Sequence, residues 1–520
     1  MISNLNFEEQ TNLKARFVII GGGTVGLILA HKLASLKVGK VIVLELGEEA
    51  ISTASEKFPT VTFPRSIYQG AEAGRFAGLG GTSARWGGAM IPFLPTDFEG
   101  EFKDLIDDAG SYIAEIEKIF CLPKGPYIAT HSIDLPNYVT RKAKWPKFSK
   151  RNVALLLARE IRTTTNLIVY TNAKVISFEQ DKSEIVSVIV ENMRESRFKV
   201  DCETAIITAG AIESTRMLLE IEEKSQEKID LERGSTTGLF FSDHLSVKIA
   251  DINPTDRNKL NMLVGYEFSK GGSMSNIRFE LQTNSELRKS LPPHFVHISF
   301  DLSTQGAFSI VREIVREIQQ GKFPSVSHFV KLLKFSPWML RAVWWRFVKH
   351  RLLYPENAKI EMHLVFQQFP NIDNRIKLNN ENFMKINGPS VEISWGISTQ
   401  DKINLSKILE QFKDSCEKSD LHNYAEIDFL NYVEILNNLD KGGGIFHPTG
   451  STRIEFNGIS GSVDTDLKVK ELKNLYLLST SVLNSGGGAN PTMTELMLGL
   501  RLVDHLVSQQ RVLNKNLRGL

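Results

Sequence analysis

The chain has 520 residues, of which 62 are basic, 60 are acidic and 42% are hydrophobic, for a net charge of +2. This length predicts roughly two to four lobes, and the balanced charge gives no electrostatic reason to expect a nucleic-acid partner. Three widely spaced cysteines provide neither a disulfide framework nor zinc-ligand spacing. The first sixteen residues lack the apolar core of a signal peptide, and no window has the length and low charge of a bilayer span. We therefore expect a cytoplasmic protein without a transmembrane span.

The first predicted element is a buried strand at 17–20, followed by a glycine turn and a helix. Gly21, Gly23 and Gly26 have the G-x-G-x-x-G spacing of dinucleotide sites. Gly21 permits a tight turn, Gly23 lets the backbone approach a pyrophosphate, and Gly26 lets the helix pack closely on the strand. The start of the helix then offers free N–H groups to phosphate.

A second buried strand is predicted at 41–44, and Glu45 follows it directly. An acidic side chain at this position can accept hydrogen bonds from ribose hydroxyls, which argues against a 2′-phosphate and so against NADP. The unit predicts a bound dinucleotide and leaves the choice between FAD and NAD open.

Further along the chain, the sequence changes to mixed strand and helix patterns with long polar connectors and later returns to apolar segments. This change predicts a discontinuous first domain with a second domain inserted in it. We expect the cofactor-binding domain to comprise residues 1–110, 150–251 and 440–520. The substrate-binding domain and lid segments are expected at 111–149 and 252–439.

Within the insertion, the segment 331–353 combines aromatic and basic residues. Its charges are too frequent for a bilayer span. A basic amphipathic helix can lie on a membrane surface or cap an active site, but aromatic residues at helical spacing are more often core. We therefore expect core or lid here rather than a membrane surface.

Three glycine-rich loops remain. The stretch at 79–88 contains Trp86 among its glycines, the stretch at 442–453 contains His447, and the stretch at 485–494 contains Asn490. Closely spaced glycines bring backbone amides near a planar or charged ligand.

Taken together, these motifs resemble the glucose-methanol-choline (GMC) oxidoreductase family over almost the whole chain. The stretches that carry the resemblance are 21–26 with Glu45, 78–88, 205–219, 240–244, 367–378, 391–395, 447–453 and 474–506. The resemblance implies an α/β protein with a Rossmann-like FAD-binding domain and an inserted α+β substrate-binding domain. It also implies a bound FAD.

The resemblance further implies roles for individual residues. His447 starts the loop whose histidine faces the flavin in this family, and an imidazole has a pKa suited to removing a hydroxyl proton. Asn490 precedes Pro491 and matches the family's second residue, which hydrogen-bonds the substrate oxygen; an asparagine orients but does not titrate. The residues expected at the cofactor are Gly21, Gly23, Thr24, Gly26, Glu45, Gly80, Gly81, Thr82, Ser83, Trp86, Gly87, Gly88, Val175, Ala209, Gly210, Ser481, Asn490, Pro491 and Thr492.

Two departures from the family pattern stand out. Arg85 occupies the position where some members attach FAD covalently through a histidine, so noncovalent FAD is expected. Ser479 stands where many members have an aspartate near the ribityl chain and phosphates. His244 matches a histidine that we interpret as structural, and no histidine has metal-ligand spacing, so no metal is expected.

Motif style is most similar to bacterial members that act on sugars, glycosides and related polyols. We therefore expect oxidation of a CH–OH group by hydride transfer to flavin N5, with O2, a quinone or a carrier protein as electron acceptor. A lyase of the same family that resembles the hydroxynitrile lyases, an enzyme for a non-sugar alcohol, a flavin-binding protein without turnover and an NAD-dependent dehydrogenase are the alternatives.

Overall fold

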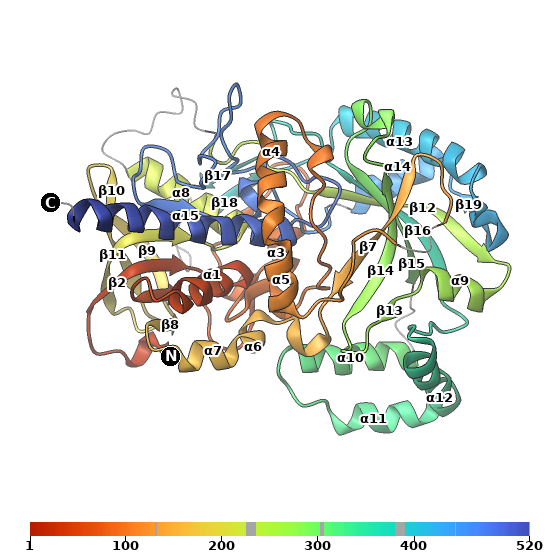
Figure 1. Cartoon of the computed structure of the whole chain (residues 1–520), viewed down its shortest axis with the longest axis horizontal. Coiled ribbons are helices and arrows are strands. Elements are labelled where there is room, and N and C mark those ends of the chain that lie inside the picture. Colours follow the sequence, from red (N-terminus) through yellow and green to blue (C-terminus); the bar gives the residue numbers. More distant parts are fainter. Residues whose placement is uncertain (130–132, 225–235, 302–305, 380–389, 443, 519–520) are drawn as a thin grey trace.

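The computed structural model describes residues 1–129, 133–224, 236–301, 306–379, 390–442 and 444–518. Two large β-sheets lie beside each other along the longest axis of the molecule, each with its own hydrophobic core (Figure 1). The fold is mixed α/β, as expected.

The first sheet has eight strands, and its centre is parallel. The strands are β1 (Ile2–Asn4), β8 (Leu167–Thr171), β3 (Val41–Leu44), β2 (Asn12–Ile20), β11 (Arg197–Ile207), β10 (Glu184–Glu191) and β9 (Lys174–Asp181) in sheet order, with β20 (Leu475–Leu477) beside β11. The predicted strand 17–20 is the end of β2, where every side chain is buried because β3 and β11 flank it.

Helices pack on this sheet, and two from opposite ends of the chain lie side by side: α1 (Thr24–Ser35) and α15 (Thr492–Arg518) (Figure 1). Their close approach depends on Gly499, because a Cβ there would lie 2.8 Å from the side chain of Leu29. The remaining helices of this half are α2 (Ala54–Lys57), α3 (Gly70–Ala73), α4 (Gly100–Ala109), α5 (Ile113–Phe120), α6 (Val153–Leu156), α7 (Ala158–Thr163) and α8 (Ala211–Lys224).

The second sheet has seven antiparallel strands. They are β13 (Glu267–Phe268), β14 (Met274–Leu281), β15 (His294–Asp301), β16 (Lys359–Gln367), β12 (His244–Pro254) and β19 (Ala425–Phe429), with β7 (Tyr138–Trp145) on the other side of β14. The helices of this half are α9 (Arg257–Val264), α13 (Thr399–Glu417) and α14 (Tyr432–Gly442). Small sheets join β5 (Val61–Thr62) with β18 (Ser390–Ser394) and β17 (Arg375–Asn379), and β4 (Ser52–Thr53) with β6 (Phe76–Ala77).

A helical lobe projects below the second sheet in Figure 1. It contains α10 (Ala307–Gln319), α11 (Val326–Leu332), α12 (Ser336–Trp344) and a π-helical turn at Trp345–Lys349. Of the five aromatic side chains in this stretch, Trp345 is buried, Phe335 and Trp338 are half-buried, and Trp344 and Phe347 are 48% and 68% exposed. The expectation of core is therefore wrong for Trp344 and Phe347, and the alternative of a lid stays a prediction. Within the described residues, no helix combines the length and apolarity needed to cross a bilayer.

Candidate active site

The glycine turn between β2 and α1 has the backbone geometry that its three glycines predict. Gly21 has a φ of +107°, and a Cβ there would lie 2.6 Å from the carbonyl oxygen of Thr208. A Cβ on Gly26 would lie 2.0 Å from the carbonyl oxygen of Gly21, so only glycine allows this contact between helix and strand. Gly23 has no atom within 4 Å of its Cβ position, which leaves its backbone open to a ligand.

A cavity runs from this turn to the C-terminal loops, and His447 lies on its wall. Twelve of the residues expected at the cofactor also line it: Gly21, Gly23, Thr24, Glu45, Gly81, Thr82, Trp86, Val175, Ala209, Gly210, Pro491 and Thr492. An open glycine turn, a helix N-terminus and a long cavity are the features that a dinucleotide needs, so the residues present fit FAD.

Glu45 lies on the cavity wall and also shapes the turn. Its carboxylate accepts hydrogen bonds from the backbone N–H groups of Gly22 at 2.7 Å, Gly47 at 2.9 Å and Gly78 at 2.8 Å. Burial raises the pKa of Glu45, and these three bonds oppose that rise. A carboxylate has about four acceptor positions, so one remains for a ribose hydroxyl.

Seven residues expected at the cofactor are not among those lining the cavity: Gly26, Gly80, Ser83, Gly87, Gly88, Ser481 and Asn490. Ser83 illustrates the reason, because its hydroxyl donates to the carbonyl of Gly80 at 2.5 Å and accepts from the N–H of Val153 at 3.0 Å. The hydroxyl of Ser481 lies 2.5 Å from that of Ser479. The hydroxyls of Ser83 and Ser481 thus stabilise the conformation of their loops. Asn490 does not line the cavity itself but contacts His447, which does.

Other wall residues were not among those expected at the cofactor, although Glu213, Arg216 and Glu495 lie in stretches that carry the family resemblance. Arg75 and Arg216 both pair with Glu213, at 3.0 and 2.7 Å, and all three line the cavity. Glu495, in the first turn of α15, is a buried carboxyl on the same wall. Burial raises the pKa of Glu495 to about 8, against a bond from the Thr480 N–H, so the carboxyl keeps its proton at neutral pH.

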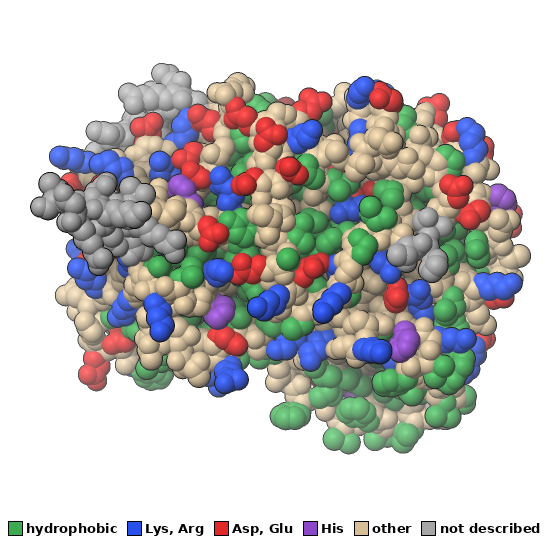
Figure 2. Space-filling view, viewed as in Figure 1, with side chains coloured by type: hydrophobic (Ala, Val, Ile, Leu, Met, Phe, Trp, Pro, Cys, Tyr) green, Lys and Arg blue, Asp and Glu red, His purple; other side chains and the backbone are tan. Residues whose placement is uncertain are grey.

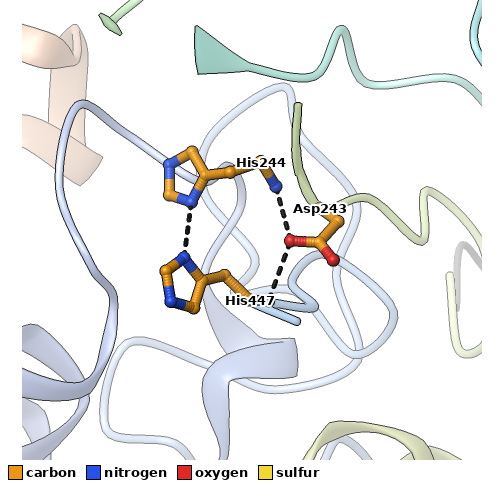
Figure 3. Close-up of side chains that lie close together, drawn as sticks. All are labelled: Asp243, His244 and His447. Carbon is orange, nitrogen blue, oxygen red and sulfur yellow. Dashed lines mark hydrogen bonds between the residues drawn. The ribbon is translucent and has the colours of Figure 1, made fainter. Parts of the chain in front are cut away.

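Two histidines and an asparagine form a hydrogen-bonded row beside the cavity. His244, the first residue of β12, has its Nε2 2.8 Å from the carbonyl oxygen of Gly487. Its Nδ1 lies 3.2 Å from Nδ1 of His447, and Figure 3 shows these two ring nitrogens joined across the gap between nearly perpendicular rings. Nε2 of His447 lies 3.2 Å from the side-chain nitrogen of Asn490. His244, expected to be structural, therefore contacts the expected base directly.

The polarity of this row fixes the tautomers of both imidazoles. The carbonyl of Gly487 can only accept, so Nε2 of His244 carries the proton. Burial lowers the pKa of His244 to about 4, so its ring is neutral and its Nδ1 accepts from Nδ1–H of His447. Burial, with His244 and then Arg278, also holds the pKa of His447 well below its usual value. The His447 ring is therefore neutral, with its lone pair at Nε2.

Arg278, on β14, fixes the orientation of Asn490 independently. A guanidinium can only donate, and Nη1 of Arg278 lies 3.4 Å from the side-chain oxygen of Asn490. The amide nitrogen of Asn490 must therefore point at His447 and donate to its Nε2. The fully buried Glu280 accepts from Nε of Arg278 at 2.5 Å and holds the guanidinium in place. Both deductions thus assign the same acceptor role to Nε2 of His447.

Asp243 fixes the backbone on both sides of the row. One carboxylate oxygen accepts from the N–H groups of His244 at 2.6 Å and His447 at 2.8 Å (Figure 3). The other accepts from the hydroxyl of Tyr68 at 2.7 Å and the N–H of Phe446 at 2.9 Å. Burial raises the pKa of Asp243 to about 6, and these four bonds favour its ionised form. The loop that carries His447 is therefore tied to the start of β12.

Asp243, His244 and His447 also have ligand atoms within 4.8 Å of one another, which would suit a metal ion by distance alone. The Asp243 carboxylate already accepts four hydrogen bonds, and the Nδ1 atoms of the two histidines bond to each other. The expectation that the protein holds no metal stays a prediction.

Part of this sequence matches a known family, and the fold matches solved structures. Residues 370–499, which include His447 and Asn490, match the family model described as GMC oxidoreductase. No curated protein matches the chain. Pyridoxine 4-oxidase from Mesorbium loti has a similar structure, with 14% identity, a TM-score of 0.57, and 94% of this chain and 98% of that chain covered.

A formate oxidase structure is also similar, with 14% identity and a TM-score of 0.54, covering 97% of this chain and all of the other. An R554A variant of the Aspergillus oryzae RIB40 formate oxidase, described for its FAD modification, has 14% identity and a TM-score of 0.56, with 96% and 99% covered. Residues 370–499 thus match the GMC oxidoreductase family, and nearly the whole chain shares the fold of these oxidase structures.

Proposed function

We propose that this protein oxidises a CH–OH group of a sugar, glycoside or related polyol, with His447 as the base and Asn490 as the orienting residue. The observation that carries the proposal is the 3.2 Å contact between Nε2 of His447 and the amide nitrogen of Asn490, beside the cofactor cavity. FAD, when bound, supplies the hydride acceptor.

The side-chain chemistry follows from the polarity of the row. A substrate hydroxyl placed between the two groups donates to Nε2 of His447 and accepts from the amide of Asn490. Transfer of the hydroxyl proton to Nε2 makes the adjacent carbon a better hydride donor. His244 holds the proton of His447 on Nδ1, so Nε2 stays available as the acceptor. His244 is thus a positioning residue.

The cofactor residues and domains are part of the same proposal. The residues that line the cavity would hold the cofactor, with the Gly21–Gly23 turn and the start of α1 at its pyrophosphate. The division into two domains is supported by the two sheets. The first sheet carries the glycine turn, whereas the second sheet supplies His244 from β12 and Arg278 from β14. The predicted substrate-binding ranges, 111–149 and 252–439, differ from the two sheets in two places. β12 begins in the predicted FAD-binding range but belongs to the second sheet, and α5 lies in the predicted substrate-binding range but packs in the core of the first.

The substrate class rests on the combination of the loop at 78–88 with the segment 474–506, which resembles sugar-acting members of the family. The test is anaerobic mixing of the purified protein with sugars, glycosides, polyols, simple alcohols and pyridoxine, while the absorbance of oxidised flavin is followed. Pyridoxine is included because one similar structure bears the name pyridoxine 4-oxidase.

We expect a sugar, glycoside or polyol to bleach the flavin fastest. Faster bleaching by a simple alcohol or by pyridoxine would contradict the substrate class. A flavin that no donor reduces would contradict the oxidation itself and favour a lyase or a flavin-binding protein without turnover.

A further inference from the structure

The helical lobe formed by residues 307–349 concentrates the exposed apolar side chains of the protein. Of 26 large hydrophobic side chains that are exposed among the described residues, eleven lie within 318–348. Figure 2 shows this concentration as hydrophobic side chains covering the lower lobe. Soluble monomers rarely expose contiguous apolar patches of this kind, and larger patches mark interaction surfaces.

The apolar stripe of α11 faces outward. Val326, Phe329 and Val330 of α11 and Leu333, directly after it, follow the i, i+3, i+4, i+7 spacing of one helix face, and all four are exposed. A surface helix of a globular protein normally turns such a stripe toward its core. The orientation of α11 is therefore the reverse of the usual one.

The next helix repeats this arrangement. Leu340, Val343, Trp344 and Phe347 have the same spacing along α12 and its π-helical extension, and all are exposed, Leu340 to 73%. Trp345 is buried on the opposite side and anchors the segment. Two consecutive helices thus present apolar faces to solvent, and we call these two stripes together the lobe face.

The charge of this lobe is as uneven as its polarity. Seven basic residues and no acidic residue lie between Glu317 and Glu356, in a chain whose net charge is +2. Arg341 pairs with Glu356 at 2.6 Å and Arg351 with Glu267 at 3.0 Å. Four exposed lysines have no ion-pair partner among the described residues: Lys322, Lys331, Lys334 and Lys349. The apolar stripes are therefore accompanied by free positive charge.

We propose that the lobe face docks on an anionic lipid surface, with its apolar side chains in the acyl boundary and its lysines at the headgroups. Charge complementarity selects this occupant, because lysine stems extend along apolar surface while their ammonium groups reach anionic headgroups. A tryptophan at the polar–apolar boundary, here Trp344 with Lys349 over its ring at 5.2 Å, suits the same interface. The helices lie on the surface and do not span it.

The lobe contacts the rest of the protein through α10 and through Arg346. Gln319, at the end of α10, donates to the carbonyls of Ser83 at 3.1 Å and Trp86 at 3.0 Å, within the glycine-rich loop at 79–88. The guanidinium of Arg346 lies 3.9 Å from the ring centre of Phe268 on β13. Docking of the lobe would therefore set the orientation of the whole enzyme on the surface.

The test is sedimentation of the full-length, FAD-loaded protein with vesicles of phosphatidylcholine alone or mixed with phosphatidylglycerol. Two variants probe the two halves of the proposal: a triple variant, Phe329→Ser, Leu340→Ser and Phe347→Ser, and a double variant, Lys331→Glu and Lys334→Glu. The control carries the equally exposed apolar changes Phe7→Ser and Val433→Ser, outside the lobe. Flavin absorbance and thermal unfolding verify that each variant is folded.

We expect the wild type and the control to bind the anionic vesicles equally and the neutral vesicles more weakly. Each lobe variant should bind about tenfold or more weakly. Salt at about 0.5 M, where the Debye length is about 4 Å, should weaken binding of the wild type. Absence of binding at low salt, or equal binding by the triple variant, would overturn the proposal. A concentration-dependent dimer that the triple variant loses, without vesicle binding, would also overturn it and assign the lobe face to a second copy.

Discussion

The hydrogen-bonded row beside the cavity buries polar side chains, whereas the lobe face exposes apolar side chains. The two regions therefore differ from ordinary protein structure in opposite ways. The row buries His244 with Asp243 and Arg278 and gives each a hydrogen-bond partner. The lobe face leaves Leu340 and Phe347 in solvent although both could contribute to a core. Burying polar groups requires complete pairing, and exposing apolar groups forgoes burial energy. Neither arrangement favours folding, so both regions are where function is expected.

The largest effect should come from His447, the proposed base. Replacement of His447 by alanine removes the Nε2 acceptor and should slow anaerobic flavin reduction by about 10²- to 10⁴-fold. Stopped-flow absorbance of the loaded variant measures this rate, with the exposed His422→Ala as the matched control. A normal rate in His447→Ala would remove the catalytic role from the row.

A pH effect should come from the buried carboxyl of Glu495. Its pKa is raised by burial from 4.5 to about 8, so the folded protein holds this proton more tightly than the unfolded chain. The stabilisation is complete below about pH 4.5 and is lost as the pH rises toward about 8, by about 1.4 kcal/mol per pH unit. Glu495→Gln should abolish this part of the pH dependence in urea unfolding. If the free energy of unfolding changed with pH in the same way for the wild type and Glu495→Gln, this prediction would be contradicted.

A smaller effect is expected from His244. Two substitutions distinguish its hydrogen bond to His447 from its packing. His244→Phe removes the acceptor that holds the proton on Nδ1 of His447, and should lower the rate of flavin reduction by about 10- to 100-fold. His244→Asn offers a carbonyl oxygen as acceptor and should recover part of that loss. Substrate KM should change little in either variant. Equal rates for the two variants would show that packing, rather than the tautomer, matters at this position.

The smallest effect should come from the lobe face. Leu340→Ser should change the free energy of unfolding by less than about 0.5 kcal/mol, because its side chain is mostly exposed. Urea unfolding followed by tryptophan fluorescence measures it. A loss of about 2 kcal/mol or more, typical of a core leucine, would mean that the lobe face is covered in solution.

Local pattern explains which parts could be predicted. The β2–α1–β3 unit was predictable because its strands are short apolar runs and its glycines meet local needs: Gly21 has a φ of +107°, and Gly26 lies against the carbonyl of Gly21. The contacts of His244 and Arg278 were not, because β12 and β14 meet the C-terminal loops only in the folded chain. In the lobe, periodicity indicates that a helix has an apolar face without indicating what the face contacts. The expectation of core was wrong for Trp344 and Phe347 for that reason, and the alternative of a lid stays a prediction.

The most direct test of the central claim, that the His447–Asn490 pair removes a hydroxyl proton as hydride leaves the same carbon, is an isotope measurement. The alcohol that bleaches the flavin fastest is prepared with deuterium on its carbinol carbon, and anaerobic bleaching is compared with that by the unlabelled alcohol. We predict slower bleaching with the deuterated alcohol and, for both alcohols, much slower bleaching in His447→Ala. Equal bleaching rates for the two alcohols in a wild-type single turnover, together with an unimpaired His447→Ala variant, would contradict the account.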